Sequence, residues 1–212
     1  MRSNVEFWKE LQSEGYFEKH PCYRGLTDVH PAAEVELIKS FLPLSADMDV
    51  VVIGCGYGRE SAHVAPLVHR LFGIDVSDVI LDKAVAYLSQ QSVFNFVPVR
   101  ADCYKETIPD DAVDLVFSIV TMQHLTRDLV ADYFSSLSKK LKVGGAMLVQ
   151  FLEVFGHEPC RDAELRVYEP SVSWTLPEIA GLCQSCGLSF SVRSIVATDA
   201  ALWHWLHASR ID

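Results

Sequence analysis

Apolar residues follow two patterns along this chain: short continuous runs, and stripes repeated every three or four positions. The continuous run at residues 50–53 predicts a strand buried on both faces, and four further strands are predicted at residues 68–74, 94–99, 113–120 and 146–152. Two further strands are predicted near 188–197 and 201–208. Between the runs lie helical stripes such as Ile80, Ala84 and Leu88. This order predicts an α/β fold: a doubly wound, Rossmann-like sheet of seven strands, mostly parallel, with a C-terminal antiparallel hairpin.

Residue types that favour helix ends mark the predicted helix boundaries. Ser77, Thr126 and Thr175 are placed to cap the first turns of three helices. The Gly144–Gly145 pair is predicted to end the helix that begins at Thr126. A shorter helix is predicted at 59–65, ended by the proline that follows it.

We predict a single domain over residues 1–212, because the chain is long enough for one core and has no low-complexity linker. Residues 1–48 form a helical lead-in or lid, and residues 49–152 form a cofactor-binding half. Residues 153–212 supply a substrate-side loop and the C-terminal strands. Loops as long as the one that opens this last segment tend to be functional.

The first predicted strand runs into a glycine-rich stretch, VVVIGCGYGRES at residues 50–61. Its glycines, Gly54, Gly56 and Gly58, allow backbone to approach a ligand without Cβ clashes. Their spacing is GxGxG, with Arg59 following, whereas a dinucleotide loop has GxGxxG. No Gly-Lys-Ser/Thr follows, so a phosphate-binding loop of the NTPase type is also excluded.

Polar residues also follow the next three predicted strands. Asp75 ends the second strand, where a carboxylate can accept hydrogen bonds from ribose hydroxyls. Asp102 ends the third strand, and residues 118–124 follow the fourth. In a doubly wound sheet, ligands bind beyond the carboxyl ends of the strands. Each aspartate taken alone could also be a turn residue.

With the glycine loop, these segments resemble the class I S-adenosylmethionine-dependent methyltransferases of small-molecule type. The resemblance runs from about Val35 to the C-terminus, and its most specific part is the pair GCGYG and GIDVS. It implies S-adenosylmethionine as cofactor and S-adenosylhomocysteine as product. The residues that it implies for cofactor binding are Gly54, Cys55, Gly56, Tyr57, Gly58, Asp75, Val76, Ala101, Asp102, Cys103, Ser118 and Ile119.

The resemblance gives these residues distinct roles. The glycine loop lines the methionine part of the cofactor, Asp75 holds the ribose and Val76 flanks the adenine. Asp102 accepts from the adenine amino group and Cys103 donates its backbone N–H to the ring. One position departs from the family: Val52 stands where members commonly carry an acid, two positions before the first glycine.

The predicted activity is transfer of the methyl group to an O or N atom of a polar small molecule. His124 is the candidate general base, because histidine ordinarily titrates near neutral pH; the alternative is that it packs against or caps the next helix. The candidate substrate-binding residues carry Arg, His and Tyr side chains in two loops: Tyr23, Arg24, His30, His157, Arg161 and Tyr168. A protein substrate, or an inactive cofactor-binding regulatory subunit, remains an alternative.

The composition limits the classes of molecule that the protein is expected to bind. The formal net charge is −10, which disfavours nucleic acid as the main partner. No apolar run is long enough to span a membrane and no signal-peptide core is visible, so a cytoplasmic protein is expected, as a monomer or homodimer. Six cysteines include a CxxC at Cys183 and Cys186, which we interpret as core residues of a helix; no metal is predicted.

Overall fold

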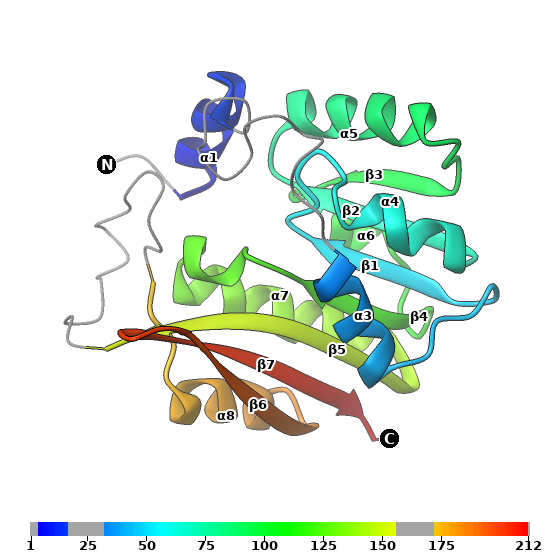
Figure 1. Ribbon diagram of the computed structural model, residues 1–212. Coiled ribbons are helices and arrows are strands. Elements are labelled where there is room, and N and C mark those ends of the chain that lie inside the picture. Colours follow the sequence, from blue (N-terminus) through cyan, green and yellow to red (C-terminus); the bar gives the residue numbers. More distant parts are fainter. Residues whose placement is uncertain (1–3, 17–31, 156–171, 212) are drawn as a thin grey trace. The chain divides into compact units, whose positions relative to one another are not determined.

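The computed structural model of the chain describes residues 4–16, 32–155 and 172–211 (Figure 1). Its strands form a seven-stranded sheet with the order β3-β2-β1-β4-β5-β7-β6. This order confirms the predicted doubly wound, Rossmann-like α/β fold. The chain divides into two compact units, Met1–Thr107 and Ile108–Asp212, which are described in turn. The interpretation as one domain stays a prediction.

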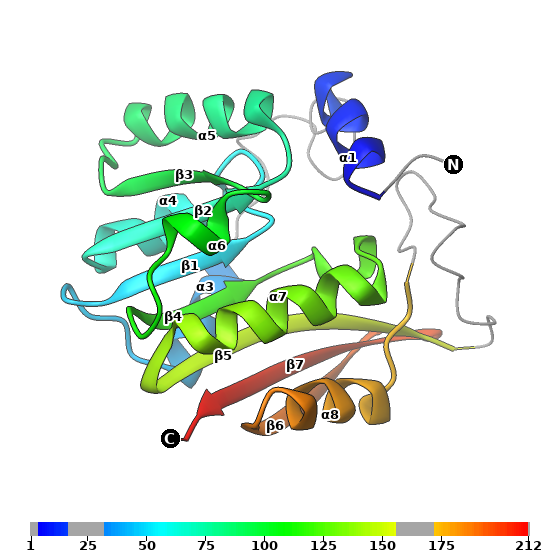
Figure 2. The ribbon, with the colours of Figure 1, turned by 180° about the vertical axis from the view of Figure 1, so that it is seen from behind.

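The first unit contains the three parallel strands that lead to the glycine loop and to the two predicted aspartates. Strand β1 pairs with β2, and β2 with β3, both in parallel. Helix α5 runs along β2 and β3 (Figure 2). The elements are α1 (Asn4–Ser13), α3 (Ala32–Phe41), β1 (Asp49–Ile53), α4 (Ser61–Val64), η2 (Ala65–Leu67), β2 (Arg70–Asp75), α5 (Asp78–Gln90), β3 (Phe96–Arg100) and α6 (Tyr104–Thr107).

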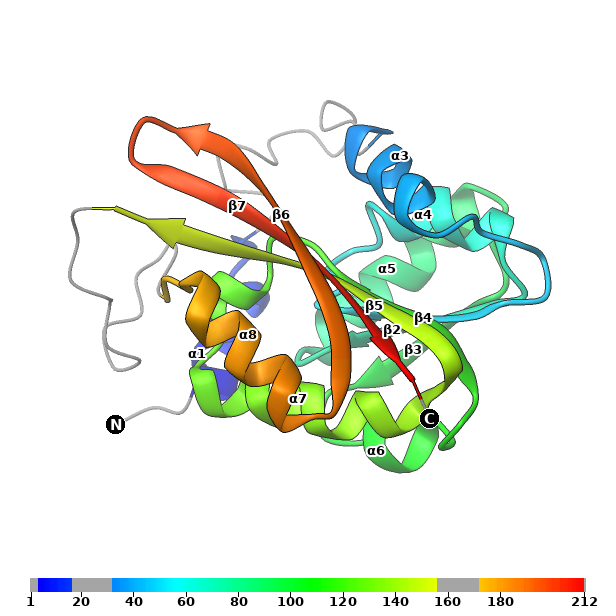
Figure 3. The same cartoon turned by 90° about the horizontal axis from the view of Figure 1, so that it is seen from below.

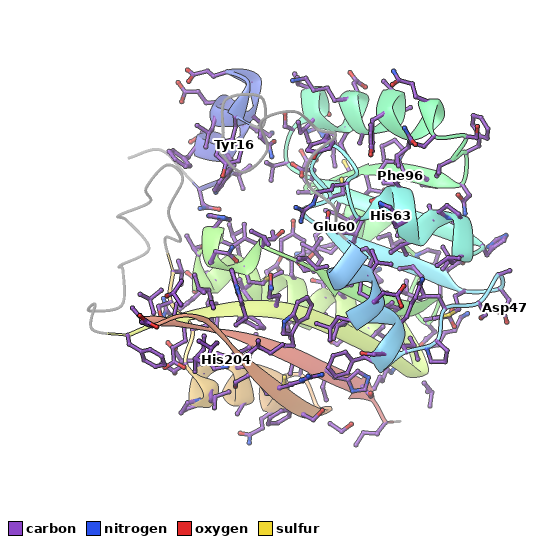
Figure 4. All side chains as sticks on the ribbon, in the orientation of Figure 1. Tyr16, Asp47, Glu60, His63, Phe96 and His204 are labelled. Atoms are coloured by element: carbon purple, nitrogen blue, oxygen red, sulfur yellow. The ribbon has the colours of Figure 1, made fainter. Side chains whose placement is uncertain are left out.

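The apolar run of β1 is buried on both faces, as its sequence predicts. Val50 and Val51 are fully buried, and Val52 is 3% exposed. In the neighbouring strand, a Cβ at Gly73 would lie 2.2 Å from the ring of Phe96 on β3, so only glycine fits beside that ring. Figure 4 labels Phe96 on this strand.

The short helix after the glycine loop differs from the prediction. Helix α4 begins at Ser61 rather than at residue 59, and the chain continues as the 3-10 turn η2. Pro66 lies inside that turn, near its start, rather than ending the helix. Proline is tolerated there because the N–H groups of the first helical turn have no acceptor within the helix, so the missing N–H of proline costs no hydrogen bond. Helix α6 was not predicted, because four residues carry no readable period.

The second unit carries the C-terminal hairpin and two of the longer helices. Strand β4 pairs with β5 in parallel, and β7 lies antiparallel between β5 and β6, which confirms the predicted hairpin (Figure 3). Helix α8 contacts β6 and α7 contacts β5. The elements are β4 (Val113–Ser118), η3 (Met122–His124), α7 (Arg127–Lys140), β5 (Leu141–Val154), α8 (Leu176–Ser185), β6 (Leu188–Thr198) and β7 (Ala201–Arg210).

The prediction that Gly144–Gly145 ends a helix is wrong. Helix α7 ends at Lys140, and both glycines lie inside β5. The register of β5 on β4 shifts between Val113 and Leu115, which marks an irregularity opposite the glycines. A Cβ at Gly145 would lie 2.9 Å from the backbone oxygen of Lys142, so this tight stretch of strand requires glycine.

The predicted helix caps are confirmed in position and differ in detail. The Thr126 side chain accepts a hydrogen bond from the Leu129 N–H at 3.4 Å. Ser77 precedes α5, but its side chain makes no capping hydrogen bond within the part of the chain that the structure describes. At Thr175 the N–H and the hydroxyl both donate to Glu178, at 2.8 and 2.9 Å. Arg127 completes this cluster, with Nη2 3.0 Å from the Glu178 carboxylate.

Replacing Glu178 with glutamine is expected to lower the melting temperature at neutral pH and to have less effect in acid. Burial raises the pKa of Glu178, but the bonds from Thr175 and Arg127 outweigh burial, and the net shift of the pKa is downward. The stabilisation is therefore present above the unfolded value, about 4.3, and is lost as the pH falls through the lower folded pKa. Thermal melts of both proteins at pH 7, 5, 4 and 3 check this. A difference that does not change with pH would contradict it.

A buried histidine joins the three C-terminal strands. His204 on β7 is fully buried and is labelled in Figure 4. Its Nε2 lies 2.7 Å from Oε2 of Glu153 on β5, and its Nδ1 lies 2.8 Å from Oγ of Ser194 on β6. Both ring nitrogens are therefore satisfied in an interior that would penalise an unpaired polar atom.

Replacing His204 with leucine is expected to destabilise the fold by about 1–3 kcal/mol, because Glu153 loses its partner while only partly exposed. Ser194 is exposed and can bond to water instead, so Ser194→Ala is the matched control with a smaller effect. Urea unfolding of the three proteins measures both changes. Equal stability of His204→Leu and the parent would show that the cluster contributes nothing.

Candidate cofactor and active site

The glycine loop after β1 adopts the backbone that its sequence pattern predicts. Gly54, Gly56 and Gly58 have φ angles of 69°, 52° and 97°, in the left-handed region that favours glycine. The N–H groups of Gly54 and Cys55 donate to the Ile74 oxygen at 2.8 and 3.0 Å. These bonds attach the loop to the end of β2, directly before Asp75.

Asp75 is buried at the end of β2 and is held by donors from three parts of the first unit. Its exposed fraction is 5%. Oδ2 accepts from the Gly56 N–H at 3.0 Å, and Oδ1 accepts from the Val76 N–H at 2.7 Å. Oδ1 also accepts from Nε2 of Gln12 on α1, at 3.1 Å. Loop, strand end and N-terminal helix thus meet at one carboxylate.

Burial raises the pKa of Asp75 above its ordinary value, and the hydrogen bonds from Gln12, Gly56, Val76 and Ser77 oppose that rise. Burying a carboxylate is costly, and carboxylates whose pKa is perturbed by burial are found preferentially at functional sites. Asp75 is therefore the candidate cofactor contact with the clearest structural basis in the first unit.

Cys55 lies inside the glycine loop and is 4% exposed. Burial raises the pKa of its thiol well above the ordinary value, and the nearby Asp75 charge adds to the effect. A thiol in that state is a poor nucleophile, so the loop contributes its backbone rather than this sulfur. Tyr57, also in the loop, is 4% exposed and packs edge-on against Tyr87 of α5.

The segment after β3 holds the other predicted adenine contacts. The Ala101 N–H donates to the Asp75 backbone oxygen at 2.9 Å, which joins the ends of β2 and β3. Asp102 is exposed, and its carboxylate accepts from Arg100, with Nε at 2.9 Å. That hydrogen bond lowers the pKa of Asp102. The Cys103 N–H, predicted to donate to the adenine ring, donates here to the Arg100 oxygen at 3.0 Å.

In the second unit, the end of β4 carries the candidate residues for the donor methyl and for catalysis. Ser118 is fully buried and Ile119 is 7% exposed. His124 is half-buried at the end of η3, and its backbone N–H donates to the Thr121 backbone oxygen at 2.9 Å. The histidine therefore lies on a short, backbone-bonded turn directly after the strand.

Sequence reasoning missed a strained residue in this segment. Val120 has a φ of 53°, which is rare for a β-branched residue, and strained backbone of this kind clusters at functional sites. Its N–H donates to Oε1 of Gln150 on β5, at 2.9 Å. Gln150 is 5% exposed. The visible signal is a polar residue inside the apolar run AMLVQFL.

Several predictions concern residues that the structure does not place. The substrate-binding candidates lie outside the described residues: Tyr23, Arg24, His30, His157, Arg161 and Tyr168.

Within the described ranges no group of three or more His, Cys, Asp or Glu residues is arranged to hold a metal ion. Of the CxxC, which is interpreted as core residues of a helix, Cys183 is fully buried, and burial raises its pKa to about 12. Cys186 is only half-buried and lies directly after the last residue of α8. No described helix is long and apolar enough to cross a membrane.

Comparison with known proteins shows what this chain is similar to. Residues 50–145 match the family model described as a methyltransferase domain. Thiocyanate methyltransferase 1 of Brassica oleracea is 26% identical over 161 residues, covering 73% of this chain and 69% of that protein.

Solved structures agree on the fold. Phosphoethanolamine N-methyltransferase 2 of Haemonchus contortus, in complex with S-adenosyl-L-methionine, superposes with a TM-score of 0.80 at 16% identity, covering 100% of this chain and 61% of that one. The [4+2]-cyclase SpnF superposes with a TM-score of 0.80 at 11% identity, covering 99% of this chain and 97% of that one. At such identities the likeness concerns the fold alone. The match over residues 50–145, the strand order and the glycine loop joined to Asp75 are those of a class I S-adenosylmethionine-dependent methyltransferase domain.

Proposed function

We propose that the chain transfers the methyl group of S-adenosylmethionine to an O or N atom of a polar small molecule. The observation that carries the proposal is the buried Asp75 carboxylate, which accepts from the glycine loop through the Gly56 N–H. The relatives support the small-molecule part, because one is named for thiocyanate and another was solved with phosphomonomethylethanolamine. Both compounds, thiocyanate and phosphomonomethylethanolamine, are small and polar.

Within the first unit, we propose that the loop residues Gly54 to Gly58 line the methionine part of the cofactor. Asp75 accepts from the ribose, and Val76, which is half-buried, flanks the adenine. Ala101, Asp102 and Cys103 complete the adenine contacts, and the Cys103 N–H would exchange its present bond to the Arg100 oxygen for one to the ring. For Asp102 this role requires an exposed carboxylate, as observed. Besides its bonds from Arg100, the carboxylate keeps a free oxygen lone pair that can accept from the adenine amino group.

Within the second unit, we propose that Ser118 and Ile119 flank the donor methyl and that His124 takes a proton from the acceptor. The methyl of a sulfonium is already activated, so the protein's main task is to align the acceptor with the S–CH3 bond. A base is needed only where the acceptor is a hydroxyl or an ammonium group. The six substrate-binding candidates in the loops outside the described residues remain part of this proposal, as do the cytoplasmic location and the monomeric or homodimeric state.

A small anion with a sulfur acceptor is the second candidate. The match to thiocyanate methyltransferase 1 favours it, over 73% of this chain. Thiocyanate carries no proton to remove, so a base at His124 would have no part in its methylation. The two candidates therefore predict different effects of a substitution at His124.

The proposed function is tested in two steps. Isothermal titration with S-adenosylmethionine and S-adenosylhomocysteine measures cofactor binding first. Transfer of a labelled methyl group to a panel of phenols, phosphorylated amino alcohols and thiocyanate then measures activity. Absence of cofactor binding would refute the proposal. Binding without transfer to any acceptor would favour an inactive regulatory subunit, and transfer only to protein would favour a protein methyltransferase.

A further inference from the structure

Gln12 lies on the N-terminal helix α1 and ends in the cofactor-binding part of the first unit. Its exposed fraction is 5%, and its Nε2 donates to Oδ1 of Asp75 at 3.1 Å, across 63 residues of sequence. The same helix contacts α5, and Trp8 packs edge-on against Tyr16 with their rings 5.4 Å apart. Figure 4 labels Tyr16, just beyond α1. The glutamine is therefore part of a packed segment rather than a loose surface side chain.

The orientation of the Gln12 amide follows from its partner. An ionised carboxylate accepts hydrogen bonds only, so the NH2 group must face Asp75 and the carbonyl oxygen must face away from it. That oxygen, Oε1, is buried and accepts no hydrogen bond from any residue in the ranges that the structure describes. A buried carbonyl oxygen without a donor is rare in folded proteins and calls for a partner. A donor that reaches the immediate surroundings of Asp75 would satisfy this oxygen.

We propose that Gln12 is a cofactor-binding residue of the ribose subsite. Its Nε2 holds Asp75, and its Oε1 accepts a hydrogen bond from one ribose hydroxyl of S-adenosylmethionine. Adjacent hydroxyls on a ribose each carry one O–H donor, so one can serve Asp75 and the other Gln12. This inference rests on the proposed placement of the ribose at Asp75.

The proposal explains why the two side chains are joined. Asp75 alone faces backbone donors from the loop and from its own strand end. With Gln12 beside it, the pair offers two acceptors, the Asp75 carboxylate at the end of β2 and Oε1 of Gln12 on α1. The distance between these acceptors selects for the spacing of the two ribose hydroxyls. The N-terminal helix thereby contributes directly to cofactor recognition.

The test compares S-adenosylhomocysteine with its 2′-deoxy and 3′-deoxy analogues by isothermal titration. In the parent protein, loss of the hydroxyl that contacts Gln12 is expected to weaken binding about 3- to 10-fold, the value of one net hydrogen bond. In Gln12→Leu, S-adenosylhomocysteine should bind more weakly by at least that factor. Removal of the same hydroxyl should then have no further effect. Gln90→Leu, an exposed glutamine at the end of α5, is the matched control and should behave like the parent.

Other outcomes overturn the inference. Equal weakening of all three ligands by Gln12→Leu would make Gln12 a positioning residue for Asp75 only. Unchanged or tighter binding would show that its amide makes no contact with the cofactor. If Gln12→Leu fails to fold by circular dichroism, Gln12→Met, which keeps the length of the side chain, replaces it in the same comparison.

Asp75→Ala separates this inference from the proposed function. If the parent protein binds no S-adenosylhomocysteine, the proposed function fails, and the inference about Gln12, which rests on it, fails with it. If the parent binds and Asp75→Ala loses the discrimination against a deoxy analogue while Gln12→Leu keeps it, only the role of Gln12 is refuted.

Discussion

Replacing Asp75 with alanine is expected to weaken the binding of S-adenosylmethionine by about 10- to 10²-fold. Hydrogen bonds to a charged acceptor contribute about 1.5–3 kcal/mol each, and the ribose would lose at least one of them. The substitution also leaves the N–H groups of Gly56 and Val76 without their acceptor, so the glycine loop keeps only its backbone bonds to Ile74 at the end of β2. Isothermal titration measures the change.

Asp82→Asn is the matched control, because Asp82 is an exposed acid on α5. It should bind the cofactor like the parent. If Asp75→Ala bound S-adenosylmethionine within threefold of the parent, the assignment of the ribose to this carboxylate would be abandoned. Circular dichroism of each variant ensures that folded proteins are compared.

Asp75 also gives the binding a pH dependence. The ionised carboxylate is the better acceptor for ribose hydroxyls, and burial raises its pKa above the ordinary value for aspartate. Affinity for the cofactor should therefore fall as the pH drops, and the fall should begin at a higher pH than an exposed aspartate would give. Titrations of the parent and of Asp82→Asn at decreasing pH should show the same profile.

Replacing His124 with alanine is expected to lower kcat by about 10²- to 10⁴-fold for an acceptor that must lose a proton, since that is the usual contribution of a general base. Cofactor affinity should be unchanged, because the predicted role of His124 concerns the acceptor alone. Single-turnover methyl transfer measures the chemical step, and titration with S-adenosylhomocysteine measures binding separately.

The control for this prediction is His69→Ala, since His69 is 63% exposed and pairs with Asp49 on the surface of the first unit. Its turnover should match that of the parent. Unchanged turnover in His124→Ala with a hydroxyl or ammonium acceptor would remove the base from the mechanism. Unchanged turnover with thiocyanate only would favour the sulfur acceptor.

Local patterns predicted most of the secondary structure, because burial on both faces and helical stripes leave a direct mark on the order of residues. The apolar run at 50–53 became β1, and Thr126 became the cap of α7. The prediction failed at Gly144–Gly145, since glycine is equally suited to a helix end and to an irregular strand. The choice between them depended on the register of β5 against β4.

The glycine loop was predictable for a similar reason. Three glycines at alternate positions after a buried strand indicate left-handed backbone, and all three have positive φ. Asp75 could be selected because it ends the next strand. The burial of Asp75 and the donors that bind its carboxylate could not be predicted from the sequence, since they depend on how the glycine loop and α1 fold against the end of β2.

The amino-acid order by itself determined the alternation of strands and helices, the glycine loop and the candidate cofactor residues, because each depends on neighbours within a few positions. Only the tertiary structure decided which distant side chains act together. It brought Gln12 to Asp75, Gln150 to the Val120 backbone, and Glu153 to His204. The physical reason is that a hydrogen bond between segments leaves no period or spacing in the sequence, whereas burying its polar atoms without a partner would cost the fold directly.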